Sequence, residues 1–279
     1  MAEITAASVG KLREMTGAGL MDCKKALSEA NGELEAAIDI LRKKGGQIAL
    51  KKGGRETNEG VIAQCILPGS RAGLLVEVNC ETDFVAKNET FRAFCDDIAR
   101  RLAENPNADV EALRTEQVAK IGENIKIARF HRLEVKGNGL VAAYIHIGAK
   151  VGVLVELGAA NEATVGNEDF KQLAKDITLQ IAAAHPLAIS RESLDPSVVA
   201  KEKEIAAEQV KNKPPQAIAK IVEGKLEKFY QTTCLVDQGF VKKNSEVSVR
   251  EHIAAVAKQL GDDIQVRHFV RFQVGEAVA

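Results

Sequence analysis

The spacing of hydrophobic residues predicts that the chain begins with three short helices. Over residues 1–54 apolar side chains recur every three or four positions, as they do on one face of a helix. The stretch 16–19 contains two glycines and predicts a tight turn after the first helix, and Asn31-Gly32 predicts the end of the second. Glycines and charged residues dominate positions 45–55, which we expect to form a linker.

Beyond this segment the pattern changes to strands followed by a helix. Apolar runs at 61–67 and 73–78 predict two strands, and the sequence Pro-Gly-Ser at 68–70 supplies a turn between them. Apolar residues at helical spacing over 88–103 then predict a helix.

This strand–strand–helix pattern occurs a second time, at a constant offset along the chain. Further strands are predicted at 140–147 and 151–157. The offset that places Gly73 on Gly152 also aligns two turn glycines and a phenylalanine near the start of each helix, without a gap. We therefore predict a duplicated α+β core.

The last part of the chain combines a helical insertion with a final strand. Asp195-Pro196 is typical of a helix start, and the prolines within 213–215 separate two amphipathic stretches. This pattern predicts a protruding antiparallel helical hairpin, close to a short coiled coil, whose apolar stripe is either an internal seam or a dimer contact. A helix over 247–260 and a strand over 264–274 follow, and we expect the strand to join the second sheet.

The expected architecture is thus α+β, with a three-helix N-terminal part, a duplicated strand–strand–helix core and an inserted helical hairpin. Its predicted parts are an N-terminal helical domain, 1–54; a first core subdomain, 55–139; a second core subdomain, 140–185 and 231–279; and the hairpin, 186–230.

Charge and composition exclude several classes of protein. The chain has 279 residues with 38 Lys and Arg against 39 Asp and Glu, whereas proteins dedicated to nucleic acids are usually basic. No apolar run approaches the roughly 20 residues that a membrane-spanning helix needs, and the N-terminus has no signal-peptide pattern. We expect a cytoplasmic protein that binds neither nucleic acid nor membrane.

The sequence contains no pattern typical of a metal site, a cofactor site or a catalytic centre. Its five cysteines are dispersed, with no C-x-x-C pair, so we expect reduced thiols packed in the core. There is no P-loop, no G-x-S-x-G and no H-E-x-x-H. Nothing positive supports an enzyme, although catalytic groups can also come together only in the fold.

The strongest candidate for a binding site is the connection between the second strand and the following helix, which we expect to be a loop over 82–85. Here Phe84 lies next to the carboxylate of Asp83, and an exposed aromatic ring offers a large apolar area to a partner. The alternative is that Phe84 folds back onto the helix and Asp83 caps it. The second copy has Glu162-Ala163 instead, so the connection itself does not require the pair, which favours binding.

His146 is predicted at the end of a strand, beside a turn. Its position alone favours the interpretation that it is an edge or capping histidine.

Two long segments resemble the signatures of the elongation factor Ts family. Residues 77–87, Glu-Val-Asn-Cys-Glu-Thr-Asp-Phe-Val-Ala-Lys, resemble the central signature of that family, and residues 12–27 resemble its N-terminal signature. Segments 121–125 and 222–225 also match, and the resemblance covers essentially the whole chain in order.

The resemblance implies a guanine nucleotide exchange factor for the translational GTPase elongation factor Tu, with no catalytic residues, metal or cofactor of its own. It implies that the N-terminal helices adopt a fold like that of ubiquitin-associated domains and contact the nucleotide domain of the GTPase. It also implies that the hairpin serves in contact with the GTPase and in forming a homodimer or a 2:2 complex.

The resemblance also implies roles for particular residues. Contact with the GTPase falls on Arg13, Leu20 and Met21, and His146 corresponds to a family histidine near the same interface. The residues that match the element displacing Mg²⁺ from the GTPase are Thr82, Asp83, Phe84 and Val85.

Two features depart from the family pattern. Gly10 occupies a position where a lysine is common. From the segment 275–279 we expect no counterpart of the C-terminal helix that some members have. A different class of function also stays open, namely a helical-hairpin adaptor that binds a partner without nucleotide exchange.

Overall fold

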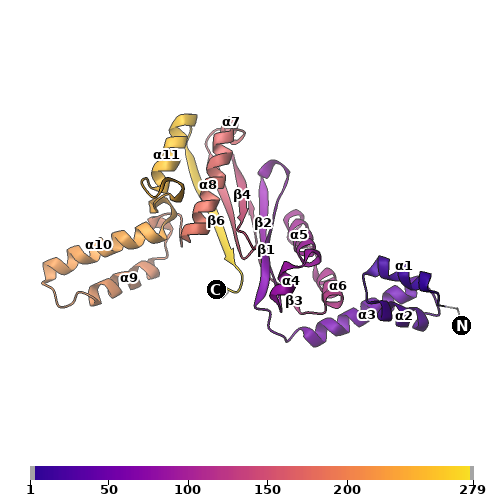
Figure 1. Ribbon diagram of the computed structural model, residues 1–279. Helices are drawn as coiled ribbons and strands as arrows, with labels where there is room; N and C mark the ends of the chain where they lie inside the picture. The colour runs from indigo at the N-terminus through magenta and orange to yellow at the C-terminus, as the bar shows by residue number, and fades with distance from the viewer. Residues whose placement is uncertain (1–3, 277–279) are drawn as a thin grey trace. The chain divides into compact units, whose positions relative to one another are not determined.

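The structure is a computed structural model that describes residues 4–276, with the side chains of Pro215 and Gln216 left out (Figure 1). It mixes helices with two three-stranded sheets, so the predicted α+β class is confirmed. The chain forms two compact units. Unit 1 comprises the described residues of Met1–Ala63, Val76–Phe130 and Val274–Ala279, and unit 2 comprises Gln64–Leu75 and His131–Gln273.

The chain begins with the three predicted helices, α1 (Ala6–Thr16), α2 (Leu20–Glu29) and α3 (Leu34–Lys52). Gly17 ends α1 in the left-handed conformation, and its N–H donates to the carbonyl of Arg13. The helices pack around a small shared core, formed by Val9, Leu12, Cys23, Ala26, Leu27 and Ala37.

The predicted linker at 45–55 is wrong over most of its length, because α3 continues through Gly45 and Gly46 to Lys52. Gly45 is buried, and a Cβ added there would lie 3.3 Å from the Cβ of Ala119 in α6 (Glu111–Ile121). The glycine thus permits a close approach of α3 to α6. Packing between the two helices outweighs the low helix propensity of glycine.

The first sheet has the strand order β1-β2-β3, with β1 at Glu59–Ile66, β2 at Ala72–Cys80 and β3 at Ile125–Glu134. Every residue of β2 is buried. After β2 come α4 (Asp83–Lys87) and α5 (Glu89–Glu104), and α5 buries Phe91, Cys95, Ile98 and Leu102. Helix α5 confirms the helix predicted over 88–103, whereas neither α6 nor β3 was predicted from the sequence.

The second sheet is antiparallel with the order β4-β5-β6, its strands being β4 (Gly139–Ile145), β5 (Val151–Ala159) and β6 (Ile264–Gln273). The final strand therefore joins this sheet, as predicted. Figure 1 shows the accompanying helices, which are α7 (Glu162–Val165), α8 (Glu168–Ala184) and α11 (Val249–Leu260). The hydrophobic core between this sheet and its helices includes side chains of β5, α8 and α11, among them Val155, Leu157, Phe170, Ile177 and Ile253.

The duplication extends further in the structure than the sequence pattern indicates, because β6 and α11 repeat β3 and α6. A buried glutamate in each middle strand pairs with a basic residue of the third strand. Glu77 Oε2 lies 2.7 Å from Arg129 Nε in the first copy, and Glu156 Oε2 lies 2.8 Å from His268 Nδ1 in the second. Both copies thus place a glutamate and a basic residue in contact at equivalent positions.

The predicted helical hairpin consists of α9 (Pro196–Glu208) and α10 (Pro215–Thr233), which run side by side (Figure 1). It is inserted between α8 and α11, where the first copy has only residues 105–110. At its base Arg191 forms ion pairs with Glu227 at 2.6 Å and Asp237 at 2.7 Å, and its guanidinium lies 4.7 Å from the centre of the Tyr230 ring.

Four short 3₁₀ turns complete the structure, η1 (Pro68–Ser70), η2 (Arg191–Ser193), η3 (Leu235–Asp237) and η4 (Val241–Lys243). Within residues 4–276, none of the helices has the length and apolar character needed to cross a membrane.

Candidate partner-binding site

The segment predicted as a loop at 82–85 is instead the start of helix α4. Thr82 is the residue that caps this helix, because its Oγ1 accepts a hydrogen bond from the Val85 N–H at 3.3 Å. Asp83 is the first residue of this short helix. The helix predicted over 88–103 is capped by Asn88, whose side chain accepts hydrogen bonds from the Thr90 and Phe91 N–H groups, so the alternative in which Asp83 caps that helix is wrong. A helix of five residues is too short to produce a recognisable apolar period, which explains the incorrect loop assignment.

The Phe84 side chain points away from the protein, with 81% of the residue exposed. The alternative in which Phe84 folds back onto the next helix is therefore wrong. The anchor of α4 is Ala86, which is buried. Because a fully exposed aromatic ring is unfavourable in water, Phe84 presents an apolar surface suited to a partner.

Asp83 is held as a carboxylate next to this ring. Its side chain accepts a hydrogen bond from Lys87 Nζ at 2.7 Å, one helical turn further on. This hydrogen bond, together with the charge of Lys87, lowers the pKa of Asp83 below its ordinary value. At neutral pH, α4 thus presents an anionic group and an apolar ring on neighbouring residues.

The start of α4 is fastened to the short segment that precedes β3. The Glu123 carboxylate accepts hydrogen bonds from the backbone N–H of Glu81 at 3.1 Å and of Thr82 at 3.0 Å, and from Thr82 Oγ1 at 2.6 Å. In return, the Glu81 carboxylate accepts a hydrogen bond from the Asn124 N–H at 2.6 Å. Two carboxylates therefore cross-link the two segments in opposite directions.

Further contacts stabilise the charge of Glu81. The Asn124 N–H lowers the pKa of Glu81, and Arg55 adds an ion pair at 3.2 Å. Glu123 and Asn124 were not predicted from the sequence as functional candidates, although both lie within the segment 121–125 that matched the family. An acid and an amide just before a strand give no local signal of a contact made more than 40 residues away.

The three N-terminal candidates lie around the connection between α1 and α2. Arg13 is exposed in the last turn of α1, and Leu20 and Met21 begin α2 with 53% and 62% of their surface exposed. Met15 is also 57% exposed at this connection and was not identified from the sequence. These four exposed residues, three apolar and one cationic, are called the α1–α2 surface.

His146 follows the last residue of β4, in unit 2, and begins the turn to β5. Its backbone N–H donates to the Val151 carbonyl at 2.9 Å, and its ring Nδ1 lies 3.0 Å from Tyr144 Oη. The next residue, Ile147, is 90% exposed and was not identified from the sequence. The turn therefore presents an imidazole and an apolar side chain.

The first copy builds the corresponding turn with the same backbone geometry but different residues. Ser70 and Ala149 have φ values of 54° and 58°, respectively. Leu67 and Pro68 stand where the second copy has His146 and Ile147. The turn itself requires neither of the two exposed side chains.

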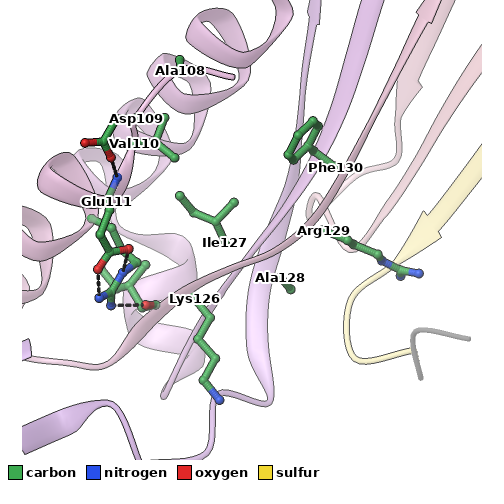
Figure 2. A pocket seen from close by; sticks show the side chains of 11 residues that line it. Ala108, Asp109, Val110, Glu111, Lys126, Ile127, Ala128, Arg129 and Phe130 are labelled. Atoms are coloured by element: carbon green, nitrogen blue, oxygen red, sulfur yellow. Dashed lines mark hydrogen bonds and ion pairs between the residues drawn. The ribbon is translucent and has the colours of Figure 1, made fainter. Parts of the chain in front are cut away.

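The described residues of unit 1 also line hollows, two of which are large. One, of about 770 Å³, lies between residues 108–114 and β3, and Figure 2 shows Ile127 and Phe130 beside it. The Glu111 carboxylate at its edge accepts a hydrogen bond from Arg114 Nε at 2.8 Å. The other, of about 660 Å³, is lined by α3, α6 and the α1–α2 connection. Within residues 4–276 no cluster of three or more His, Cys, Asp or Glu side chains could hold a metal ion.

Comparisons with known proteins agree with the resemblance of the two signatures. A family model described as "Elongation factor TS" matches residues 81–276. Elongation factor Ts of Lawsonia intracellularis is 43% identical over 292 aligned positions, which cover 98% of this chain and 99% of the relative. The proteins of the same name from Symbiobacterium thermophilum and Clostridioides difficile are each 43% identical, covering the whole of this chain and 94% and 95% of the relatives. The chain therefore belongs to the elongation factor Ts family.

Proposed function

We propose that this protein is a guanine nucleotide exchange factor for elongation factor Tu and that it acts in the cytoplasm. In this proposal it binds the GDP complex of the GTPase, displaces Mg²⁺ and releases GDP so that GTP can bind. The observation that carries the proposal is the exposed Phe84, held on a short helix beside the carboxylate of Asp83. Membership in the elongation factor Ts family supports elongation factor Tu as the partner.

The physical basis is a thermodynamic coupling between two ligands of the GTPase. A GTPase holds GDP largely through its phosphates and through the Mg²⁺ that neutralises them. Inserting Phe84, Thr82 and Val85 between elements of the GTPase shifts the groups that hold the ion, and the Asp83 carboxylate adds negative charge nearby. Because the exchange factor binds best to the nucleotide-free form, it must weaken nucleotide binding by the same factor.

Other exposed residues extend the proposed interface. The α1–α2 surface, with Arg13, Leu20 and Met21, contacts the nucleotide domain of the GTPase, and His146 contributes from unit 2. The hairpin of α9 and α10 serves either in contact with the GTPase or in association of two copies of this chain. Neither contact requires a nucleotide pocket or a bond-breaking step in the protein itself, which is therefore not an enzyme in this proposal.

The test is release of a fluorescent GDP analogue from elongation factor Tu, with catalytic amounts of this protein added. We expect the wild type to accelerate release and the double variant Asp83→Ala/Phe84→Ala to lose most of that acceleration. Two controls are matched to the altered residues. Glu162→Ala removes the acidic residue that corresponds to Asp83 in the second copy, and Leu187→Ala removes another exposed apolar side chain.

Each outcome has a definite meaning. Loss of acceleration in the double variant alone supports both the exchange function and the role of α4. Equal acceleration by the wild type and the double variant would support the exchange function but show that it depends on contacts other than those of Asp83 and Phe84. Binding without release by the wild type would overturn the proposal and favour an adaptor.

A further inference from the structure

Helix α4 is too short to hold its own shape. It contains five residues, Asp83–Lys87, whereas isolated helices shorter than about 12 residues are marginal in water. Phe84 contributes little to anchoring it, because its ring is exposed. The direction in which the ring points must therefore be set by contacts of α4 with the rest of the chain, which are the burial of Ala86, the hydrogen bond from Arg92 Nε to the Ala86 carbonyl, and the contacts at the start of the helix.

At the start of α4, three hydrogen bonds are made to the side chain of Glu123. Glu123 accepts three hydrogen bonds from Glu81 and Thr82, including one from the hydroxyl that caps α4. Glu123 directly follows Gly122, which ends α6 in the left-handed conformation with φ of 81°. The carboxylate thus connects the end of α6 to the first turn of α4.

The second copy contains a similar connection. Asp262 follows Gly261, which ends α11 with φ of 63°, and it stands two residues before β6, as Glu123 stands two residues before β3. The Asp262 carboxylate accepts hydrogen bonds from the Asn161 N–H at 3.1 Å and from Asn161 Nδ2 at 3.0 Å. An acid before the third strand is therefore part of the shared scaffold.

The two copies differ in what this acid holds. In the second copy Ala163 stands in place of Phe84, and Ala160 stands in place of Glu81, so the reciprocal carboxylate is absent there. The first copy has the additional bond from the Asn124 N–H to Glu81. The reciprocal bond thus occurs in the copy that presents an aromatic ring.

We propose that Glu123 is a positioning residue for Phe84, acting through the first turn of α4 and fixing the direction in which the ring meets the GTPase. This inference rests on the proposed exchange function and deepens it. Glu123 need not touch the GTPase. Glu123 restricts the conformations of the exposed segment before binding. Less conformational entropy is therefore lost when the ring is inserted into the GTPase.

The variants follow from the hydrogen bonds. Glu123→Ala removes all three acceptor contacts, and we expect the maximal rate of GDP release to fall about tenfold, as the loss of hydrogen bonds to a charged group predicts. Glu123→Gln keeps an oxygen able to accept the two backbone N–H groups, so it should restore most of the rate. Asp262→Ala is the matched control, which removes the corresponding acid from the second copy and should leave the rate unchanged.

A double-mutant cycle separates positioning from a general loss of structure. If Glu123 acts through the ring, Glu123→Ala should have no further effect on GDP release in a Phe84→Ala background. An equal fall in both backgrounds, or an equal fall in Asp262→Ala, would overturn the inference.

Amide hydrogen exchange of the free protein provides a measurement that does not depend on the GTPase. Glu123→Ala should speed exchange over residues 81–88, while Asp262→Ala should leave that segment unchanged. Unchanged exchange over 81–88 in Glu123→Ala would refute positioning even in a fully active protein. A wild type that fails to release GDP would refute the exchange function instead, and with it the functional part of this inference.

Discussion

Replacing Phe84 by alanine should separate folding stability from partner binding. Because 81% of this residue is exposed, only about 40 Å² of the roughly 200 Å² of an aromatic side chain lies against the protein. At about 25 cal/mol per Å² this contact stabilises the fold by no more than about 1 kcal/mol. The higher helix propensity of alanine offsets part of that loss.

The effect on binding should be much larger. The exposed part of the ring offers about 160 Å² to a partner, and its full burial corresponds to about 4 kcal/mol. Since ordering and imperfect packing reduce such gains, we expect a loss of about 2–4 kcal/mol, as for a central interface residue. The Kd for nucleotide-free elongation factor Tu should rise by about 30-fold to 1,000-fold.

Two measurements test this expectation. Urea unfolding gives the free energy of unfolding, and titration calorimetry with nucleotide-free elongation factor Tu gives the affinity. Phe91→Ala is the contrasting variant, because Phe91 is fully buried in α5 and its truncation should cost about 3–5 kcal/mol of stability. A comparable loss of stability in Phe84→Ala, or an unchanged Kd, would refute the argument.

Three further predictions concern the scaffold. Gly60→Ala and Gly139→Ala should each lower the free energy of unfolding, measured in urea, by about 2 kcal/mol or more. The new Cβ would lie 2.3 Å from the Val78 carbonyl oxygen in the first variant and 2.5 Å from the Leu157 carbonyl oxygen in the second. Losses below about 0.5 kcal/mol would contradict this close approach. Burial lowers the pKa of His252 in the folded protein below its ordinary value of 6.5. Between the folded pKa and 6.5 the unfolded chain therefore binds more protons than the folded protein, so the free energy of unfolding should decrease as the pH falls through that range. His252→Gln should flatten this slope in urea unfolding at several pH values, and an unchanged slope would assign it to other groups. Arg191→Ala should speed amide hydrogen exchange in α9 and α10 without affecting β4, because it removes the ion pair with Glu227 at the base of the hairpin; unchanged exchange would show that the helices hold one another without it.

Local sequence signals were sufficient for much of the fold. Helical spacing predicted α5 and the two hairpin helices, and the constant offset between Gly73 and Gly152 predicted the duplication. These features are recognisable because each depends on residues that are close in the sequence. Strand β3 was missed because only Ile125 and Leu133 of its ten residues are buried, and the charged residues between them obscure any alternation.

The sequence by itself also marked the segment 82–85 as the candidate site and determined the family. Only the tertiary structure decided how the site is built. Phe84 points outward because Thr82 caps α4 and Ala86 anchors it, and Glu123 fastens the helix from a position about 40 residues away. In the same way, contact with α6 keeps α3 helical through Gly45. Such contacts join segments that are far apart in the chain, so no local sequence pattern predicts them.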